Sequence, residues 1–352
     1  MAVTRLSISD ALNITNSIFI DVRTSLEFEE GSIPGAINVP ILSNEERVEI
    51  GTLYKQKGAE VARERGLDII SPKLPTLFLR IKTAAFEKMP ILYCARGGLR
   101  SQTVATVLDL TGLKVCVVEG GYKNYRQEVL NVLNSPYPFK LITLYGFTGS
   151  GKTHLLNKMK EKGLPVIDLE ALAHHRGSVF GQVGIIPKQT QKNFEALLYQ
   201  EIKKYKESPQ IFIEGESKRI GPVVLPQLWM EHMEKGSKIL IRSSLEKRTE
   251  RILKEYLGEG DKNLVPELEK ALFSIEKRLG GELFKKIHTL FQQEDYKGAT
   301  CLLLEHYYDQ NYKFSSMAPE EAFSHTFENN SHGDEERITL EMRRLTVSFK
   351  TR

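Results

Sequence analysis

The chain has 352 residues, about the length of two ordinary domains. Hydrophobic residues make up 41% of it and charged residues 27%, a balance that excludes wholesale disorder and a collagen-like fibre. The 49 basic and 45 acidic residues leave a net charge of +4, which neither requires nor excludes binding to nucleic acid.

The three cysteines, Cys94, Cys116 and Cys301, show no CxxC spacing and no zinc-like pairing with histidines. We therefore expect no disulfide framework and a reduced, cytoplasmic protein. No segment approaches the ~18 consecutive apolar residues of a membrane helix. The sequence thus predicts neither a metal site nor a membrane span.

Short apolar strands alternate with helical segments in the first part of the chain. The expected strands are Ser17–Val22, Pro90–Cys94 and Lys114–Val118. Strands separated by helices predict a parallel sheet, with ligand sites at the carboxyl ends of its strands. We therefore expect an α/β domain over residues 8–134.

Two prolines in the stretch Asn134–Pro138 mark the clearest break, because proline cannot continue a helix. The strands expected after it are Lys140–Tyr145, Pro165–Asp168, Ile211–Glu214 and Lys238–Arg242. A helical region follows from Leu245 to Phe291. We predict a second α/β domain with a helical extension over residues 139–324, and a polar, loosely held tail over residues 325–352.

The segment Cys94–Ser101 (CARGGLRS) follows an expected strand and leads into a helix. Successive backbone N–H groups in a tight loop form an anion cradle, and the helix N-terminus adds its positive dipole end. Gly97 and Gly98 let the backbone close that cradle. Cys94 at its base is the expected nucleophile.

Arg100 follows Cys94 at the C-x5-R spacing and is expected to bind an oxyanion, with Arg96 at the rim. Cys116 and Cys301 lie in apolar contexts and are expected to be core residues. The loop fits two chemistries: hydrolysis of a phosphate ester through a phosphocysteine, and transfer of sulfur or selenium through a persulfide-type intermediate.

The segment Gly146–Thr153 (GFTGSGKT) matches the G-x4-G-K-T pattern between an expected strand and a helix. Its amides are expected to cradle a diphosphate, Lys152 to reach the terminal phosphates and Thr153 to ligate Mg²⁺ if it is required. The phosphate-binding residues expected here are Gly146, Gly149, Ser150, Gly151, Lys152 and Thr153. The strand that usually supplies an Asp carries Glu214 and Glu216, which argues for a diphosphate other than hydrolysed ATP.

Further polar residues are candidates for a second site or for RNA contacts. They are His175, Arg176, Glu214, Glu216, Lys218, Arg219, Arg248 and Arg251. Adjacent histidines on a helix point about 100° apart, so His174 and His175 do not predict a metal site. A solvated helix face is the alternative interpretation of the arginines.

Several segments of the first half resemble the rhodanese signature. They are Asp21–Arg23 (DVR), Glu27-Phe28 and Gly31–Pro40 (GSIPGAINVP). The resemblance implies a rhodanese-like parallel-sheet domain, followed by a P-loop NTPase-like α/β domain with a helical C-terminal part. It also implies that Cys94 carries a chalcogen. The loop is longer than the common C-x-x-G-x-R-S loop, which favours a phosphorylated chalcogen over thiosulfate as donor.

The combination of YCARGGLRS, GFTGSGKT, LEALAHHRGS and FIEGESKRIG resembles the tRNA 2-selenouridine synthase family up to about Tyr312. The resemblance implies a transferase that acts on the wobble 2-thiouridine of a tRNA anticodon loop. Its co-substrates would be geranyl diphosphate, which gives an S-geranyl intermediate, and selenophosphate, which delivers selenium through Cys94. Selenophosphate synthetase is a candidate partner. The apolar segment Pro222–Met233 is a candidate slot for the geranyl chain.

Three alternatives remain open from the sequence. One is a rhodanese-type sulfurtransferase coupled to a P-loop ATPase that adenylates its acceptor. Another is a Cys-x5-Arg phosphatase with a nucleotide-binding half. The third is a non-catalytic tRNA-binding module, against which the intact Cys94 and Lys152 argue.

Overall fold

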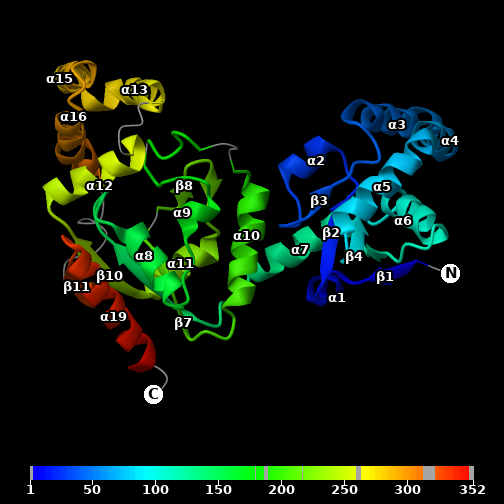
Figure 1. Cartoon of the computed structure of the whole chain (residues 1–352), viewed down its shortest axis with the longest axis horizontal. Helices are drawn as coiled ribbons and strands as arrows, with labels where there is room; N and C mark the ends of the chain where they lie inside the picture. Colours follow the sequence, from blue (N-terminus) through cyan, green and yellow to red (C-terminus); the bar gives the residue numbers. More distant parts are fainter. Residues whose placement is uncertain are drawn as a thin grey trace. The chain divides into compact units, whose positions relative to one another are not determined.

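The computed structural model describes residues 3–178, 180–185, 189–215, 217–258, 263–311 and 322–348. It forms two compact units (Figure 1), and each contains its own parallel sheet. The first unit comprises Met1–Asn134 with Thr190–Tyr199, and the second comprises Ser135–Gln189 with Gln200–Arg352. The α/β class with parallel sheets, predicted from the sequence, is confirmed.

The first unit has a five-stranded sheet in the order β1-β5-β4-β2-β3, with every pairing parallel. Its strands are β1 (Thr4–Leu6), β2 (Ser17–Asp21), β3 (Ile37–Asn38), β4 (Met89–Tyr93) and β5 (Cys116–Val118). The sequence did not predict β1 and β3, because strands of two or three residues are too short to show an alternating pattern.

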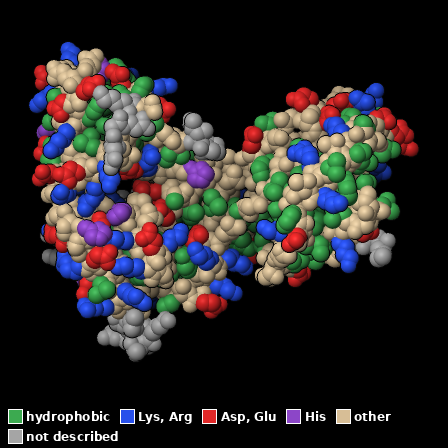
Figure 2. Space-filling view, in the orientation of Figure 1, with side chains coloured by type: hydrophobic (Ala, Val, Ile, Leu, Met, Phe, Trp, Pro, Cys, Tyr) green, Lys and Arg blue, Asp and Glu red, His purple; other side chains and the backbone are tan. Residues whose placement is uncertain are grey.

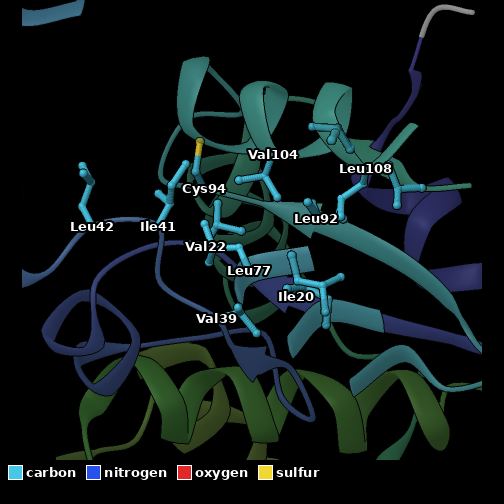
Figure 3. Packing of buried hydrophobic residues seen from close by; sticks show 14 of the residues in the cluster. Ile20, Val22, Val39, Ile41, Leu42, Leu77, Leu92, Cys94, Val104 and Leu108 are labelled. Atoms are coloured by element: carbon cyan, nitrogen blue, oxygen red, sulfur yellow. The ribbon is translucent and has the colours of Figure 1, made fainter. Parts of the chain in front are cut away.

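Seven helices and one 3₁₀ turn complete the Met1–Asn134 part of this unit. They are α1 (Ile8–Asn13), α2 (Ser25–Glu30), α3 (Asn44–Lys57), α4 (Ala59–Ile70), the turn Ser71–Lys73, α5 (Leu74–Ala85), α6 (Leu99–Leu110) and α7 (Gly121–Leu133). Capping boxes at Thr24 and Ser43 start α2 and α3. The core between sheet and helices includes Ile20, Leu92 and Val104, which Figure 3 shows packed together.

The second unit has a four-stranded parallel sheet in the order β11-β10-β6-β7. Its strands are β6 (Lys140–Tyr145), β7 (Gln210–Glu214), β10 (Ser237–Arg242) and β11 (His325–Glu328). A small antiparallel pair, β8 (Arg219–Ile220) and β9 (Val223–Val224), lies apart from it. The strand expected over Pro165–Asp168 is reduced to one bridge between Val166 and Phe212.

Helices connect the strands of this second sheet, and further helices form an extension after β10. They are α8 (Lys152–Glu161), α9 (Leu169–Leu172), α11 (Gln227–Lys235), α12 (Leu245–Leu257), α13 (Val265–Ser274), α14 (Glu276–Leu279), α15 (Gly281–Gln292), α16 (Tyr296–Leu303), α17 (Asp309–Asn311) and α19 (His332–Ser348), with a π-helical turn at Leu304–Tyr308. The helix α10 (Gln191–Lys204) belongs to the first unit up to Tyr199 and to the second unit from Gln200. The extension from α12 onward has its own apolar core, with Leu272 and Ile287 fully buried. The described residues contain no helix long and apolar enough to cross a membrane.

The last part of the chain differs from the expected loosely held tail. β11 pairs in parallel with β10 at the edge of the sheet, and α19 packs beside α8 (Figure 1). Ile338 and Met342, one helical turn apart, are fully buried in the core of the second unit. The prediction of a loose tail was wrong because the polar residues of this segment lie on the exposed face of an amphipathic helix, α19, whose apolar face is buried.

Candidate active sites

Cys94 follows β4 directly and lies at the border of the first unit's core. Figure 3 shows its sulfur pointing away from Ile20 and Val22. The side chain is 3% exposed, and the Ser101 hydroxyl donates to its Sγ at 3.3 Å. Ser101 is itself fully buried in the first turn of α6. The same hydroxyl lies 3.3 Å from the Gly98 carbonyl oxygen, so it is shared between the sulfur and the loop backbone at the N-terminus of α6.

A turn after β5 supports the cysteine loop from behind. The Tyr122 amide donates to the Cys94 carbonyl oxygen at 2.9 Å. Gly121 has φ +58°, and a Cβ there would lie 2.2 Å from that same oxygen. Gly97 has φ +62°, and its Cβ would lie 2.7 Å from the Val118 carbonyl oxygen. Both glycines are thus required by close backbone approach, whereas a Cβ at Gly98 would meet nothing within 4 Å. The sequence identified Gly97 but not the role of Gly121.

Arg100 is engaged with Glu27 from the start of α2. Its Nη1 and Nη2 donate to the two carboxylate oxygens at 2.6 and 3.0 Å. Burial raises the pKa of Glu27, but the hydrogen bond and charge of Arg100 outweigh it and leave the pKa below its usual value. The expected oxyanion-binding arginine is therefore at the loop but paired with a carboxylate. Arg96 is exposed, in agreement with a place at the rim.

The other two cysteines lie outside this loop. Cys116 is buried within β5, and burial raises its pKa. Cys301 is half-buried in α16, and burial is also the main cause of its raised pKa. A raised pKa lowers the thiolate fraction at neutral pH, so neither residue has the setting of a nucleophile.

The second loop, Gly146–Thr153, joins β6 to α8 as a phosphate-binding loop requires. The Lys152 ammonium donates to the Gly146 carbonyl oxygen at 2.7 Å, so it lies over the loop. The Thr153 hydroxyl donates to the Glu170 carboxylate at 3.0 Å. Glu214, at the end of β7, is fully buried and accepts the Glu170 amide at 2.5 Å. Glu170 was not among the expected site residues, although the segment Asp168–Glu170 stood out as the end of an expected strand.

Three glycines let neighbouring groups approach this loop. A Cβ at Gly146 would lie 2.3 Å from the Ile241 carbonyl oxygen. Gly149 and Gly151 have φ +81° and +86°, and their Cβ atoms would lie 2.9 Å from the Arg248 carbonyl oxygen and 2.7 Å from the Asn329 amide nitrogen. The Ser150 hydroxyl is buried and has no hydrogen-bond partner among the described residues. A phosphate oxygen is a suitable partner for such a buried hydroxyl.

Arg248 and Arg251 hold the outside of the phosphate loop, which corrects their expected place on an RNA-binding surface. Arg248 is 4% exposed, donates to the Thr148 carbonyl oxygen at 2.8 Å and forms a bidentate pair with Asp309. Arg251 donates to the Gly149 carbonyl oxygen at 3.3 Å and to the Ser243 hydroxyl at 2.8 Å. On the amphipathic helix α12 these arginines face the loop.

His175 and Arg176 also face inward, contrary to an RNA-facing role. The Gly177 amide donates to His175 Nδ1 at 3.1 Å, and burial together with Arg176 lowers the pKa of His175. Arg176 pairs with Glu255 at 2.9 Å and lies over the Tyr256 ring. These contacts fix the segment after α9 against α12.

The remaining expected site residues divide between the surface and the core. Lys218 and Arg219, around the start of β8, are exposed. Glu216 lies outside the described residues. Trp229, in the proposed geranyl slot, is fully buried against Tyr137, so this segment is core. Within the described ranges, no three His, Cys, Asp or Glu side chains gather as a metal site.

Two family matches cover most of the chain. Residues 6–128 match the rhodanese-like domain, and residues 139–334 match the tRNA 2-selenouridine synthase AAA domain. The chain belongs to the tRNA 2-selenouridine synthase family. The resemblance seen in the four sequence motifs is thereby confirmed, and each of the two glycine-containing loops, Cys94–Ser101 and Gly146–Thr153, lies within one matched domain.

Curated tRNA 2-selenouridine synthases are 32–38% identical to this chain over the aligned residues. The protein from Nitrosomonas europaea is 38% identical over 253 residues, which are 70% of this chain and 65% of that relative. The protein from Sulfurovum sp. is 33% identical over 86% of this chain and 89% of its own length. A solved N-terminal domain of a putative ATP/GTP binding protein from Clostridium difficile 630 is 41% identical over 36% of this chain and 99% of its own, with a TM-score of 0.35.

Proposed function

We propose that this protein converts the wobble 2-thiouridine of tRNA into 2-selenouridine in two steps. The first step transfers a geranyl group from geranyl diphosphate to the sulfur, and the second replaces the S-geranyl group by selenium from selenophosphate. The observation that carries the proposal is one chain with two loops at the carboxyl ends of parallel strands, one presenting Cys94 and the other Lys152, in a family whose curated members are named for this product.

The phosphate loop supports the geranyl step. Its amides, Lys152 and the Ser150 hydroxyl would bind the diphosphate, and Lys152 would exchange the Gly146 carbonyl for a phosphate oxygen. The thiocarbonyl sulfur then attacks the first carbon of the geranyl chain and diphosphate leaves. Alkylation makes sulfur a good leaving group, because it departs as a thiol in the second step.

Mg²⁺ is a proposed co-factor of the diphosphate step. The Thr153 hydroxyl and the carboxylates of Glu170 and Glu214 are the hard oxygen ligands that Mg²⁺ prefers, and they are linked by hydrogen bonds beside the loop. When bound, the ion would neutralise charge on the leaving diphosphate. Glu170 and Glu214 would hold it and orient Thr153.

The cysteine loop supports the selenium step, in which we propose that Cys94 receives selenium as an S–Se adduct. Transfer of that selenium to the base in place of the S-geranyl group takes two electrons from an external thiol, which ends as a disulfide and frees the Cys94 thiolate. Selenium in selenophosphate is at the selenide level, so attack of the thiolate on selenium must release phosphorus as phosphite. Attack of the thiolate on phosphorus would instead release selenide and, after hydrolysis, phosphate. Phosphorus NMR of the products separates the two routes: phosphite supports the adduct, and phosphate contradicts it.

Mass analysis of wobble nucleosides tests the function as a whole. Cells with the gene are expected to contain 2-selenouridine and S-geranyl-2-thiouridine, and cells without it only 2-thiouridine. ATP turnover stimulated by tRNA, without either product, would favour the sulfurtransferase coupled to an ATPase. Release of phosphate from an aryl phosphate without tRNA would favour the phosphatase.

The proposed tRNA substrate also bears on the binding partners of the protein and on its cellular compartment. The wobble base lies in a single-stranded loop, so it can be turned out without melting a helix. A tRNA substrate favours the cytoplasm. Because free selenide is readily oxidised, direct delivery by selenophosphate synthetase is a reasonable source of the selenium donor.

A further inference from the structure

We propose that Asn329 is a positioning residue that holds the phosphate loop in the conformation that binds a diphosphate, an inference that rests on the proposed function. Asn329 lies between β11 and α19. Its side chain is fully buried, and its Nδ2 donates to the Ser150 carbonyl oxygen at 2.9 Å. A residue 179 positions away in the sequence thus contacts the loop backbone directly.

The backbone of Asn329 is fixed on both sides, so the direction of its amide is set. Its N–H donates to the Arg242 carbonyl oxygen at 2.8 Å, which continues the pairing of β11 with β10. Its carbonyl oxygen accepts the Ser243 hydroxyl at 2.6 Å and Arg251 Nη2 at 2.8 Å. These three bonds anchor Asn329 to the end of β10 and to α12.

Three consecutive carbonyls of the loop are held from outside. The carbonyl oxygens of Thr148, Gly149 and Ser150 accept hydrogen bonds from Arg248, Arg251 and Asn329, respectively. In a trans peptide unit the C=O and the following N–H point in opposite directions. The Ser150 amide, which follows the Gly149 carbonyl, donates to the Phe147 carbonyl oxygen at 3.0 Å and tightens the loop. The carbonyls of Thr148 and Ser150, held outward, turn the amides of Gly149 and Gly151 inward, where an anion would be bound.

Asn329 differs from the two arginines because it carries no charge. It can affect a bound diphosphate only through the geometry of the loop and not by direct attraction. Its Oδ1 is buried with no partner among the described residues, which is a cost to folding. An apolar residue would avoid that cost, so the amide donor to Ser150 is the property that explains asparagine at this position.

Titration of the full-length protein with inorganic pyrophosphate tests the inference. We expect Asn329→Ala to weaken binding about 3- to 30-fold, the effect of one lost hydrogen bond. The dependence of affinity on salt should stay as in the wild type, because no charge is removed, whereas Lys152→Ala should reduce it. If Asn329→Ala does not fold, Asn329→Leu, which also removes the donor but keeps the side-chain volume, takes its place with the same expected loss of affinity.

The variant Asn329→Asp adds a readout that a purely structural role would not affect. Its carboxylate cannot donate to Ser150 and should weaken binding more than alanine does at pH 8. Burial raises the pKa of such a carboxyl, and the protonated form regains a donor. The difference in affinity between the Asp and Ala variants should therefore shrink as the pH falls from about 8 to about 6.

Ile338→Ala is the matched control, because Ile338 is fully buried on α19 and belongs to the unit's core. It should lower the melting temperature and leave pyrophosphate affinity unchanged. Wild-type affinity in Asn329→Ala, or an equal loss of affinity in Ile338→Ala, would overturn the inference. A wild type that binds pyrophosphate but not geranyl diphosphate contradicts the proposed function and leaves the Asn329 effect measurable; one that binds neither contradicts both.

Discussion

At the scale of single residues, the two loops occupy equivalent places in their sheets. Cys94 directly follows β4 and Gly146 directly follows β6, each at the carboxyl end of a parallel strand flanked on both sides by other strands. Ligands of open α/β sheets bind at this edge. The two loops differ in what they present to an anion: one offers a nucleophilic sulfur and the other a lysine.

Replacing Cys94 by Ser should abolish selenation and leave geranyl transfer largely intact. In the proposed mechanism Cys94 serves the selenium step, whereas the thiocarbonyl sulfur is itself the nucleophile during alkylation. Mass analysis of tRNA nucleosides after incubation with each co-substrate measures both reactions. Cys116→Ser, within β5, is the control and should keep both reactions; equal loss of both in a folded Cys94 variant would contradict this division.

Replacing Lys152 by Ala should slow geranylation about 30- to 1,000-fold, the equivalent of ~2–4 kcal/mol of lost charge-assisted contacts to the diphosphate. The measurement is the initial rate with geranyl diphosphate and thiolated tRNA. The same variant, supplied with S-geranylated tRNA, should still perform selenation. If it does not, the phosphate loop also acts in the second step.

At the scale of elements, the glycine turn after β5 controls the shape of the cysteine loop. Gly121→Ala should cost about 1–3 kcal/mol in unfolding free energy, because φ is positive and the new Cβ overlaps the Cys94 carbonyl. Selenation should fall more than geranylation. Gly281→Ala is the control, since a Cβ there meets nothing within 4 Å and φ is not positive. Urea unfolding curves of both variants measure the difference.

The elements that carry the loops could be predicted from the sequence, because local patterns determine them. The apolar runs at β4 and β6 and the glycine-rich segments after them are continuous in sequence. Glu170, Gly121 and Asn329 could not be found in this way, since each acts through a contact with a residue distant in the sequence. Glu170 meets the side chains of Thr153 and Glu214, whereas Gly121 and Asn329 meet backbone groups. The prediction for Arg248 and Arg251 was wrong. Charged residues on a helix usually indicate a solvated or RNA-binding face, but these two side chains donate hydrogen bonds to carbonyl oxygens of the phosphate loop.

At the scale of the whole molecule, the small net charge means that tRNA must be bound by local basic surface. Basic and acidic side chains are interspersed on the face shown in Figure 2. Among the expected RNA contacts, Lys218 and Arg219 are exposed. Backbone contacts give a log–log salt slope of about −0.7 per neutralised phosphate of a single strand.

Charge reversal of Lys218 and Arg219 together should therefore weaken tRNA binding and flatten the salt slope by about 1 to 2. Filter binding at a series of salt concentrations measures the slope. The double reversal of Lys206 and Lys235, two other exposed lysines, is the control and should change it less. An equal effect of both pairs would mean that only net charge matters and that tRNA contacts other parts of the surface.

The pairing of β11 with β10 has a consequence for how the protein is made. The ribosome synthesises the phosphate loop early, but the partner of the Ser150 carbonyl arrives 179 residues later. A nascent chain can thus form β6 and α8 long before its loop is held in shape. Translation that stops before β11 would leave a product with the complete GFTGSGKT motif and a poorly ordered anion site, so incomplete chains should compete little for the geranyl donor.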